Sequence, residues 1–196
     1  MNKKNIVLAS ESPRRKELLK RMGLKFKVVP AKIKENLGRR FQAKALKKIA
    51  FQKAAVVSGK IEKGLIIAAD TIVVVKGVIY GKPETIKKAR VMLKTLSGTT
   101  QNVWTAVAII DKYSGKKEIK TCVSRIRMKN LAKNEIEYLA AKNLDKAGGY
   151  GIQEDDKYLK VLKGSRTNIV GLPTELLSGM LARFGVKSKP IVRYKF

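Results

Sequence analysis

Strand-like and helix-like segments alternate along this chain, which predicts an α/β or α+β domain rather than an all-β or all-helical one. The strand-like segments are short apolar runs, and the helix-like segments carry apolar residues three or four positions apart. A length of 196 residues suits one domain with a sizeable core, and no repeat or low-complexity segment interrupts it. We therefore expect a single domain over residues 1–196, with a basic tail at about 187–196.

The N-terminal elements follow from an apolar run and from helix-capping residues. Residues 6–9 are apolar and predict a strand. A helix is expected to begin at Ser12, because Ser12 suits the N-cap, Pro13 suits the first helical position and Gly23 can end the helix. Residues 26–29 predict a second strand, and a polar loop through Glu35 follows it.

The remaining elements follow from periodicity and turn residues. Small and apolar residues at helical spacing predict a helix over residues 41–57, and an almost continuous apolar run predicts a buried strand over 65–75. Lys76 and Gly77 turn the chain toward a short strand at 78–80. Beyond it we expect helices at 85–96, 134–142 and 173–184, and strands at 101–110, 123–128 and 159–162.

Two arginines stand where a helix disfavours them. Arg14 and Arg15 lie in the first turn of the expected helix, where cations face the positive end of the helix dipole. The hydroxyls of Ser10 and Ser12, the free backbone N–H groups and the two guanidinium groups together suit a phosphate. The alternative is a solvated basic helix end in a lysine-rich protein.

The composition excludes several kinds of chemistry. The chain has no histidine, which excludes imidazole-based acid–base catalysis, serine triads that use histidine, and histidine-ligated zinc. The single cysteine, Cys122, excludes an internal disulfide framework and suits a reducing cytoplasm. No apolar stretch has the length of a membrane span or of a signal peptide, so we expect a cytoplasmic protein without a membrane partner.

The formal net charge of +29 raises the question of nucleic-acid binding. The excess is spread along the chain and is mostly lysine, without an arginine-rich block or an aromatic RNA-binding signature. We therefore expect a general lysine bias that attracts anionic ligands, with nucleic-acid contact as the alternative.

Asp70 interrupts the apolar run of the expected strand at 65–75. An ionised carboxylate there is costly to desolvate unless it meets a cation, a metal or several donors, so we expect Asp70 to line a cleft. The alternative is a strand that bends or ends at Asp70. Glu35 could join Asp70 around Mg²⁺ or Mn²⁺, or it could pair with a nearby arginine, Arg39 or Arg40.

These residues belong to an ordered set of motifs that resembles the Maf-like nucleotide pyrophosphatases, also called septum-formation inhibitors. The resemblance spans residues 6 to about 185. In chain order the matching positions are Ala9, Ser10, Ser12, Arg14 and Arg15, then Glu35, Lys53, Ala69-Asp70-Thr71, Gly81-Lys82-Pro83, the segment 145–153 and the segment 168–173.

The resemblance implies an elongated α/β fold shared with inosine-triphosphate pyrophosphatases, with a central mixed sheet flanked by helices and two lobes around a cleft. It implies hydrolysis of a nucleoside triphosphate between the α and β phosphates, and it includes a homodimer as an expectation.

The resemblance also implies a role for each matching residue. Asp70 would accept a proton from the attacking water, and Glu35 and Asp70 would hold the divalent cation, Mg²⁺ or Mn²⁺. Lys53 and Lys82 would neutralise phosphate charge. The triphosphate would be held by Ser10, Ser12, Arg14 and Arg15.

Arg14, Thr71 and Gln153 resemble the set found in the family's dTTP/UTP branch. A glutamine amide offers a donor and an acceptor, which match the imide edge of uracil or thymine. The chain departs from the family at Asn102, where histidine is usual, and at Glu154, where glycine is usual. We expect a dTTP/UTP pyrophosphatase that cleans the nucleotide pool; the alternative is a nucleotide-sensing or nucleic-acid-associated regulator of cell division.

Overall fold

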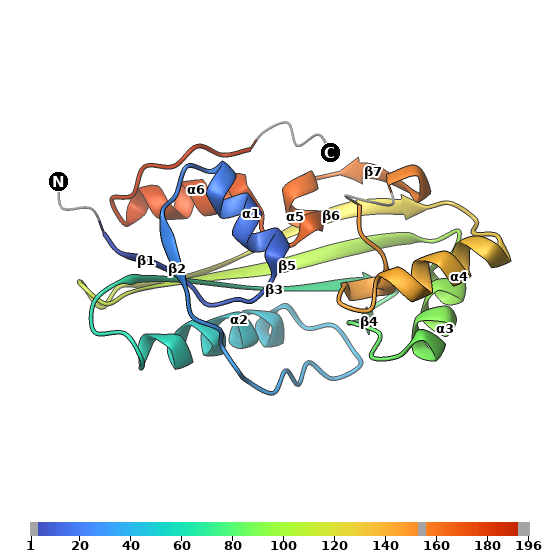
Figure 1. The fold of residues 1–196 in the computed structure, drawn as a ribbon, viewed down its shortest axis with the longest axis horizontal. Coiled ribbons are helices and arrows are strands. Elements are labelled where there is room, and N and C mark those ends of the chain that lie inside the picture. Colours follow the sequence, from blue (N-terminus) through green and yellow to red (C-terminus); the bar gives the residue numbers. More distant parts are fainter. Residues whose placement is uncertain (1–3, 153–155, 192–196) are drawn as a thin grey trace.

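The computed structural model describes residues 4–152 and 156–191. A seven-stranded mixed sheet has the order β2-β1-β3-β5-β6-β7, and β4 also pairs with β3 (Figure 1). The strands are β1 (Ile6–Leu8), β2 (Phe26–Val28), β3 (Leu65–Val75), β4 (Val78–Tyr80), β5 (Thr100–Asp111), β6 (Lys117–Met128) and β7 (Leu159–Lys163).

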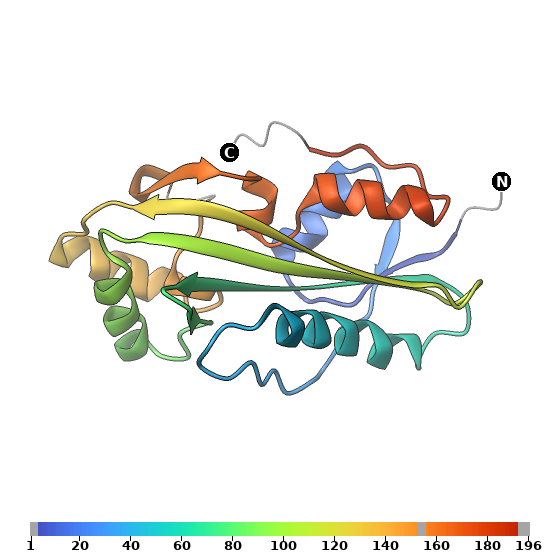
Figure 2. The same ribbon diagram turned by 180° about the vertical axis from the view of Figure 1, so that it is seen from behind.

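Helices cover both faces of this sheet, which is elongated along β3, β5 and β6 (Figures 1 and 2). They are α1 (Pro13–Arg21), α2 (Ala43–Ser58), α3 (Ile86–Leu96), α4 (Lys133–Lys142), α5 (Arg166–Val170) and α6 (Thr174–Arg183), with short 3-10 turns at Ala147–Gly149 and Asp156–Tyr158. None of these helices is long and apolar enough to span a bilayer. The mixed sheet flanked by helices confirms the expected fold class.

Alternate residues of β3 enter two hydrophobic clusters, because successive side chains of a strand point to opposite faces. Ile66, Ala68 and Ile72 belong to the cluster that contains the buried residues of α2. Ile67 and Ala69 belong to the cluster on the other face, which contains buried residues of α1, α3, α4 and α6. Burial on both faces explains why this strand reads as an almost unbroken apolar run.

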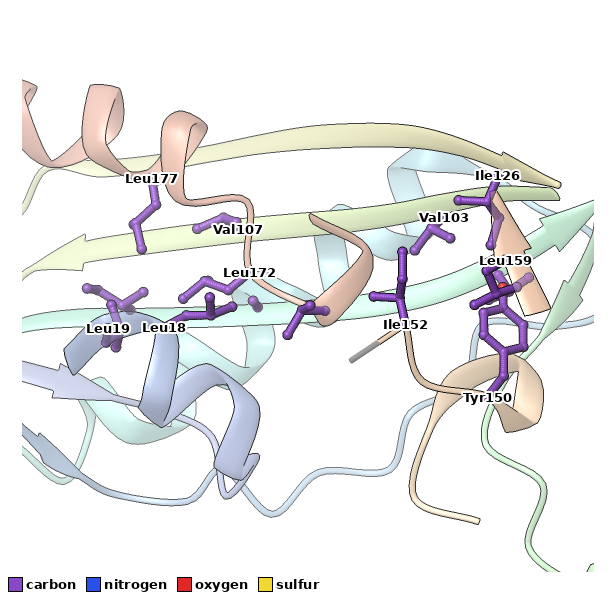
Figure 3. Packing of buried hydrophobic residues seen from close by; sticks show 14 of the residues in the cluster. Leu18, Leu19, Val103, Val107, Ile126, Tyr150, Ile152, Leu159, Leu172 and Leu177 are labelled. Carbon is purple, nitrogen blue, oxygen red and sulfur yellow. The ribbon is translucent and has the colours of Figure 1, made fainter. Parts of the chain in front are cut away.

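Figure 3 shows how the larger cluster extends along one face of the sheet. Leu18 and Leu19 of α1 lie near Leu177 of α6 at one end. Tyr150 and Ile126 lie at the other end. One apolar cluster therefore extends along this face from α1 and α6 to Tyr150 and Ile126.

Most expected elements are confirmed to within one or two residues at their ends, but one strand begins earlier than expected and one helix is missing from the expectations. The strand expected at 123–128 begins at Lys117, because it pairs along nearly the whole length of β5. The five-residue helix α5 was not expected at all. The described part of the tail packs on the protein: the Lys189 N–H donates to the Met22 carbonyl, and the Ile191 N–H donates to the Thr174 hydroxyl.

One edge of β3 contains a gap. β1 pairs in parallel with Leu65, Ile66 and Ile67, and β4 pairs antiparallel with 73–75 on the same edge. Among the described residues, no strand pairs with this edge over 68–72, whereas β5 pairs with the opposite edge from Leu65 to Val74. The sheet therefore opens beside Asp70 without any break in the strand that carries it.

Candidate functional site

A cavity of about 640 Å³ occupies this gap. Its polar walls come from the start of α1, from α2 and from the loops around residues 35 and 82, and its apolar walls come from β3, β5, α5 and the segment around residue 150. A second hollow of about 270 Å³ lies against the loop before α1. Seven residues line both: Ser12, Arg14, Arg15, Glu35, Lys53, Lys82 and Asp145.

Asp70 is buried at the centre of the gap, with 5% of its surface exposed. Its Oδ1 atom lies 2.5 Å from the Lys53 Nζ atom, and the same Nζ atom lies 2.6 Å from Glu35 Oε1. Asp70 Oδ2 is buried and has no hydrogen-bond partner among the described residues. Because β3 continues to Val75, the alternative that the strand bends or ends at Asp70 is wrong.

Burial dominates the electrostatics of Asp70 and raises the pKa of its carboxyl above the ordinary value. Lys53 acts in the opposite direction through its charge and its hydrogen bond, whereas the charge of Glu35 raises the pKa further. Glu35 pairs with Lys53 in the structure, so the expected alternative pairing with Arg39 or Arg40 is wrong.

The loop before α1 is fixed by its own side chains. Ser12 caps the helix as expected, with its hydroxyl accepting from the Arg15 N–H at 3.4 Å. The hydroxyl of Ser10 accepts from the Ser12 N–H at 3.3 Å and from Arg15 Nη1 at 3.2 Å. This places the two serines and Arg15 together beside the cavity.

Arg15 also connects α1 to the sheet. Its Nε donates to the Gly171 carbonyl at 2.9 Å, and its Nη2 donates to the Thr71 hydroxyl at 3.2 Å. The Thr71 hydroxyl lies 2.9 Å from the Thr105 hydroxyl and 3.3 Å from the Gly171 carbonyl. The side chain of Thr71 is thus already part of a protein network that joins β3, β5, α1 and the end of α5.

Arg14 meets a partner that the sequence analysis did not single out. Its Nη1 donates to Asp145 Oδ2 at 2.6 Å, and its Nη2 donates to the Asp145 carbonyl at 3.3 Å. Burial opposes ionisation of Asp145, but the hydrogen bond and charge of Arg14 outweigh it and lower the pKa of the carboxyl. Arg14, the cation in the first turn of α1 for which the sequence predicted an anionic partner, therefore pairs with Asp145, which lies 131 residues away in the chain.

Lys82 is exposed and lines both hollows from the turn that follows β4. The carbonyl of Gly81 accepts from the Gly148 N–H at 3.0 Å, which ties this turn to Ala147–Gly149. The buried Tyr150 hydroxyl donates to Gln101 Oε1 at 2.6 Å, and burial raises the pKa of Tyr150. These contacts fix the wall of the cavity opposite α1.

Glu35 and Asp70 are the carboxylates that could hold a cation here. Both converge on one Nζ atom, so the site already places a positive charge between them, and the unpartnered Oδ2 of Asp70 adds an available oxygen. No cluster of three or more acidic or cysteine side chains suited to a metal occurs in residues 4–152 and 156–191. Further ligands would have to come from substrate or water, which is usual for Mg²⁺.

Three positions named in the sequence analysis do not enter the described site. Gln153 and the departure at Glu154 lie outside the described residues, although Gly151 and Ile152 before them line the cavity. Asn102 is exposed on β5 opposite Val74 and does not line the cavity. Asp145 is the site residue that sequence reasoning missed, and its only signal was its place beside Lys146 in a family motif.

The mixed sheet with helices on both faces places the protein in a known class of α/β folds. The solved structure of the Staphylococcus aureus Ham1 protein matches it with a TM-score of 0.55 over 92% of this chain and 100% of that chain, at 14% identity. Residues 5–184 match the family described as Maf-like protein, and the chain belongs to that family.

The chain is also similar to relatives over nearly its whole length and theirs. A dTTP/UTP pyrophosphatase of Pelotomaculum thermopropionicum is 41% identical over 186 residues, covering 93% of this chain and 97% of that protein. A dTTP/UTP pyrophosphatase of Elusimicrobium minutum is 35% identical over 181 residues, covering 92% of this chain and 98% of that protein. The family resemblance seen in the motifs is confirmed.

Proposed function

We propose that this protein is a pyrophosphatase that hydrolyses dTTP and UTP to the nucleoside monophosphate and diphosphate, and so removes surplus or non-standard pyrimidine nucleotides. The names of its relatives support the substrate. The observation that carries the reaction is Asp70, a buried carboxylate with one oxygen held by Lys53 and the other without a partner among the described residues, at the centre of a nucleotide-sized cavity.

Asp70 is the proton acceptor for the attacking water in this proposal. Lys53 holds Oδ1, so Oδ2 is left to accept a proton. Burial raises the pKa of Asp70, which brings it closer to the working pH and makes the carboxylate a stronger base than an exposed aspartate.

The cationic residues shared by the two hollows bind the triphosphate. Arg14 and Lys82 line both hollows, and so does Ser12, the N-cap residue of α1. Arg15 also lines both hollows and holds the loop in place through Ser10 and Gly171. These fixed cations offset charge that develops on the phosphate oxygens during hydrolysis.

Glu35 and Asp70 would hold a divalent cation in this proposal, Mg²⁺ or Mn²⁺, both of which favour oxygen ligands. When bound, such a cation polarises phosphoryl oxygens as a Lewis acid. No observation in the described residues favours the alternative of a non-catalytic regulator, because the acidic and basic groups that hydrolysis requires meet in one cavity.

The experiment measures diphosphate release from dTTP, UTP, CTP, GTP and ITP in the presence of Mg²⁺ or Mn²⁺. Wild type is expected to act on dTTP and UTP, and Asp70→Asn is expected to lose at least about 100-fold in kcat while it still binds nucleotide. Asp111→Asn is the matched control: Asp111 is also a buried aspartate paired with a lysine, Lys4, but it lies outside the cavity. Wild-type turnover by Asp70→Asn would remove Asp70 as the base, and inactivity of wild type on all five nucleotides would overturn the proposed function.

A further inference from the structure

The face of the sheet that packs against α2 becomes exposed to solvent at the end that lies next to β7. Ile119 of β6 packs against the hydrophobic cluster that contains residues of α2. Val123, Arg125 and Arg127 follow it on the same face of β6 and are exposed. In Figure 2, α2 lies below the strands, and no helix is drawn across the ends of β5 and β6 beside β7. Within the described residues, this part of the sheet therefore presents an open strand surface.

Four cations lie in two directly opposed pairs on this surface. Arg125 of β6 lies opposite Lys163 of β7 in the strand register. Arg127 of β6 lies opposite Lys160 of β7, and all four side chains are exposed. Like charges directly opposite each other destabilise strand pairing, because their Cβ atoms lie only about 5 Å apart. Two such pairs in succession favour a surface that meets an anion.

The strands themselves do not balance these charges. Within residues 4–152 and 156–191, none of the four cations forms an ion pair with a carboxylate. Arg127 donates from Nη1 to the Thr100 hydroxyl at 3.3 Å, which holds the guanidinium over the sheet without neutralising it. Residues 100–110, 119–128 and 159–163 contain no Asp or Glu. The cavity differs in this respect, because carboxylates accompany its cations.

The only tryptophan of the chain lies on the same face. Trp104 of β5 is opposite Val123 of β6 and is partly exposed. Its ring packs against Phe41, with the two ring centroids 4.8 Å apart and the ring planes tilted by 35°. Asn102 lies two residues before Trp104 on β5, opposite Arg125, and is exposed. A supported aromatic ring and a side-chain amide thus adjoin the paired cations.

This combination favours single-stranded nucleic acid over other anionic partners. A single strand offers phosphates along its backbone for arginine and lysine, and unpaired bases that stack on an aromatic ring or on a guanidinium plane. A duplex hides the faces of its bases, and an acidic peptide has carboxylates but no bases to stack. An open strand surface also allows an extended chain to lie across it, as in sheet-based RNA-binding modules.

We propose that this face binds single-stranded nucleic acid, with the phosphates on Arg125, Arg127, Lys160 and Lys163 and one base against Trp104. None of these five side chains lines either hollow of the candidate site. The binding is therefore separate from hydrolysis and does not rest on the proposed function. Nucleic-acid contact, which the net charge alone left open, thereby has a defined location on the molecule.

The first experiment measures binding of a fluorescently labelled 12-nucleotide oligo(U) to wild type by fluorescence anisotropy. Saturable binding is expected at about 50 mM salt, and the plot of log K against log salt concentration is expected to have a slope of about −3 for four phosphate contacts. Absence of saturable binding at about 50 mM salt would overturn the inference.

A pair of double variants distinguishes this face from the general lysine excess. Lys160→Gln/Lys163→Gln is expected to weaken oligo(U) binding by at least about tenfold and to reduce the salt slope by about half. Lys25→Gln/Lys27→Gln is the matched control, because both lysines are exposed and lie in or beside β2, the strand at the opposite edge of the sheet. We expect this control to change binding by less than about twofold. Equal losses in the two double variants would assign binding to the lysine excess and overturn the inference.

The folded state of both double variants is checked independently of nucleic acid. Their urea unfolding midpoints and their rates of UTP hydrolysis are expected to match those of wild type, because the four lysines are exposed and line neither hollow. The unfolding midpoint alone serves as this check if wild type does not hydrolyse UTP.

Trp104 reports directly on the place of binding, because no other tryptophan contributes to the fluorescence. Saturation with oligo(U) is expected to quench this fluorescence. Trp104→Leu is expected to weaken binding by at least about fivefold, whereas Trp104→Phe, which keeps an aromatic ring, is expected to retain most of it. Unchanged tryptophan fluorescence in the bound state would place the strand elsewhere and contradict the proposal.

Competition identifies the class of partner. A 12-base-pair RNA duplex, polyglutamate and vesicles of anionic phospholipid are each added at the same concentration of negative charge as unlabelled oligo(U). Only unlabelled oligo(U) is expected to displace the labelled strand efficiently, because only it offers both phosphates and unstacked bases. Equal displacement by the duplex, the peptide or the vesicles would show that the face recognises charge alone and would overturn its assignment to single strands.

Discussion

Burial of Asp70 opposes ionisation of its carboxyl, and this lowers the free energy of unfolding of the protein when the carboxyl is charged. Its pKa is raised in the folded protein, so the unfolded chain releases this proton at a lower pH than the folded protein does. The carboxyl's contribution to the free energy of unfolding therefore falls as pH rises from its unfolded pKa of about 3.9 through its higher folded pKa.

Asp70→Asn should consequently increase the free energy of unfolding at pH 7, and the gain should shrink as the pH approaches about 4. Lys53 keeps Glu35 as a partner in this variant, so its charge is not left alone. Urea denaturation at a series of pH values measures the difference. A variant less stable than wild type at pH 7 would mean that the attraction between Asp70 and Lys53 exceeds the cost of burial.

The ion pair of Arg14 shows which contacts of the site local sequence can predict and which it cannot. The conflict between a first-turn cation and the helix dipole predicted a missing anion near α1. It could not identify Asp145 as the anion that lies there, because that contact depends on how a segment 131 residues away folds. The pairing of Glu35 with Lys53 was likewise beyond local reasoning, since Arg39 and Arg40 are nearer in sequence.

At the scale of elements, the 3-10 turn Ala147–Gly149, which adjoins the cavity wall, requires a glycine at position 148. Gly148 has φ +77°, and a Cβ atom there would lie 2.6 Å from a ring carbon of Tyr150. Tyr150 is buried and bonded to Gln101, so its ring cannot move away at low cost.

Gly148→Ala should therefore destabilise the protein by more than Gly77→Ala does. Gly77 has nearly the same φ, +78°, but a Cβ atom there would meet nothing within 4 Å. We expect about 1–2 kcal/mol for Gly77→Ala from backbone strain, and about 1–3 kcal/mol more for Gly148→Ala from the clash. Urea unfolding of both variants gives the comparison, and equal losses would show that the Tyr150 ring adjusts freely.

The elements that the sequence predicted well are those with an unambiguous pattern. The apolar run of β3 and the Ser12 cap of α1 are confirmed by the structure. The first half of β6, residues 117–122, has no buried position and includes three charged residues, so its strand character depends on pairing with β5. The helix α5 is too short for periodicity to reveal.

At the scale of the whole molecule, the cavity arises from topology. Two short strands, β1 and β4, share one edge of β3 and leave a gap between them, so a central strand contributes an edge to the site. The sequence predicts that Asp70 lines a cleft, and the ordered motifs identify the family. Neither reveals that the cleft is a missing stretch of sheet, because strand partners are set by contacts across the chain.

The distribution of charge sets how this cavity attracts its substrate. The cavity is nearly balanced, because its cationic residues are Arg14, Arg15, Lys53, Lys82 and Lys146 and its acidic residues are Glu35, Asp70, Glu84 and Asp145. The formal net charge of the chain is +29, so almost all of the excess lies outside the cavity. The lysines outside the cavity therefore attract a triphosphate over long distances, and salt screens electrostatic attraction at such distances.

We expect kcat/KM for UTP to fall by about tenfold when ionic strength rises from about 50 to 300 mM, with little change in kcat. Encounter is weakened by screening of the distant lysines, whereas contacts inside the cavity are screened much less once the nucleotide is bound. Steady-state kinetics at fixed free Mg²⁺ separates the two parameters. A kcat/KM independent of salt would show that the lysine excess contributes nothing to substrate capture, and an equal fall in kcat would place the salt effect on the chemical step or on product release.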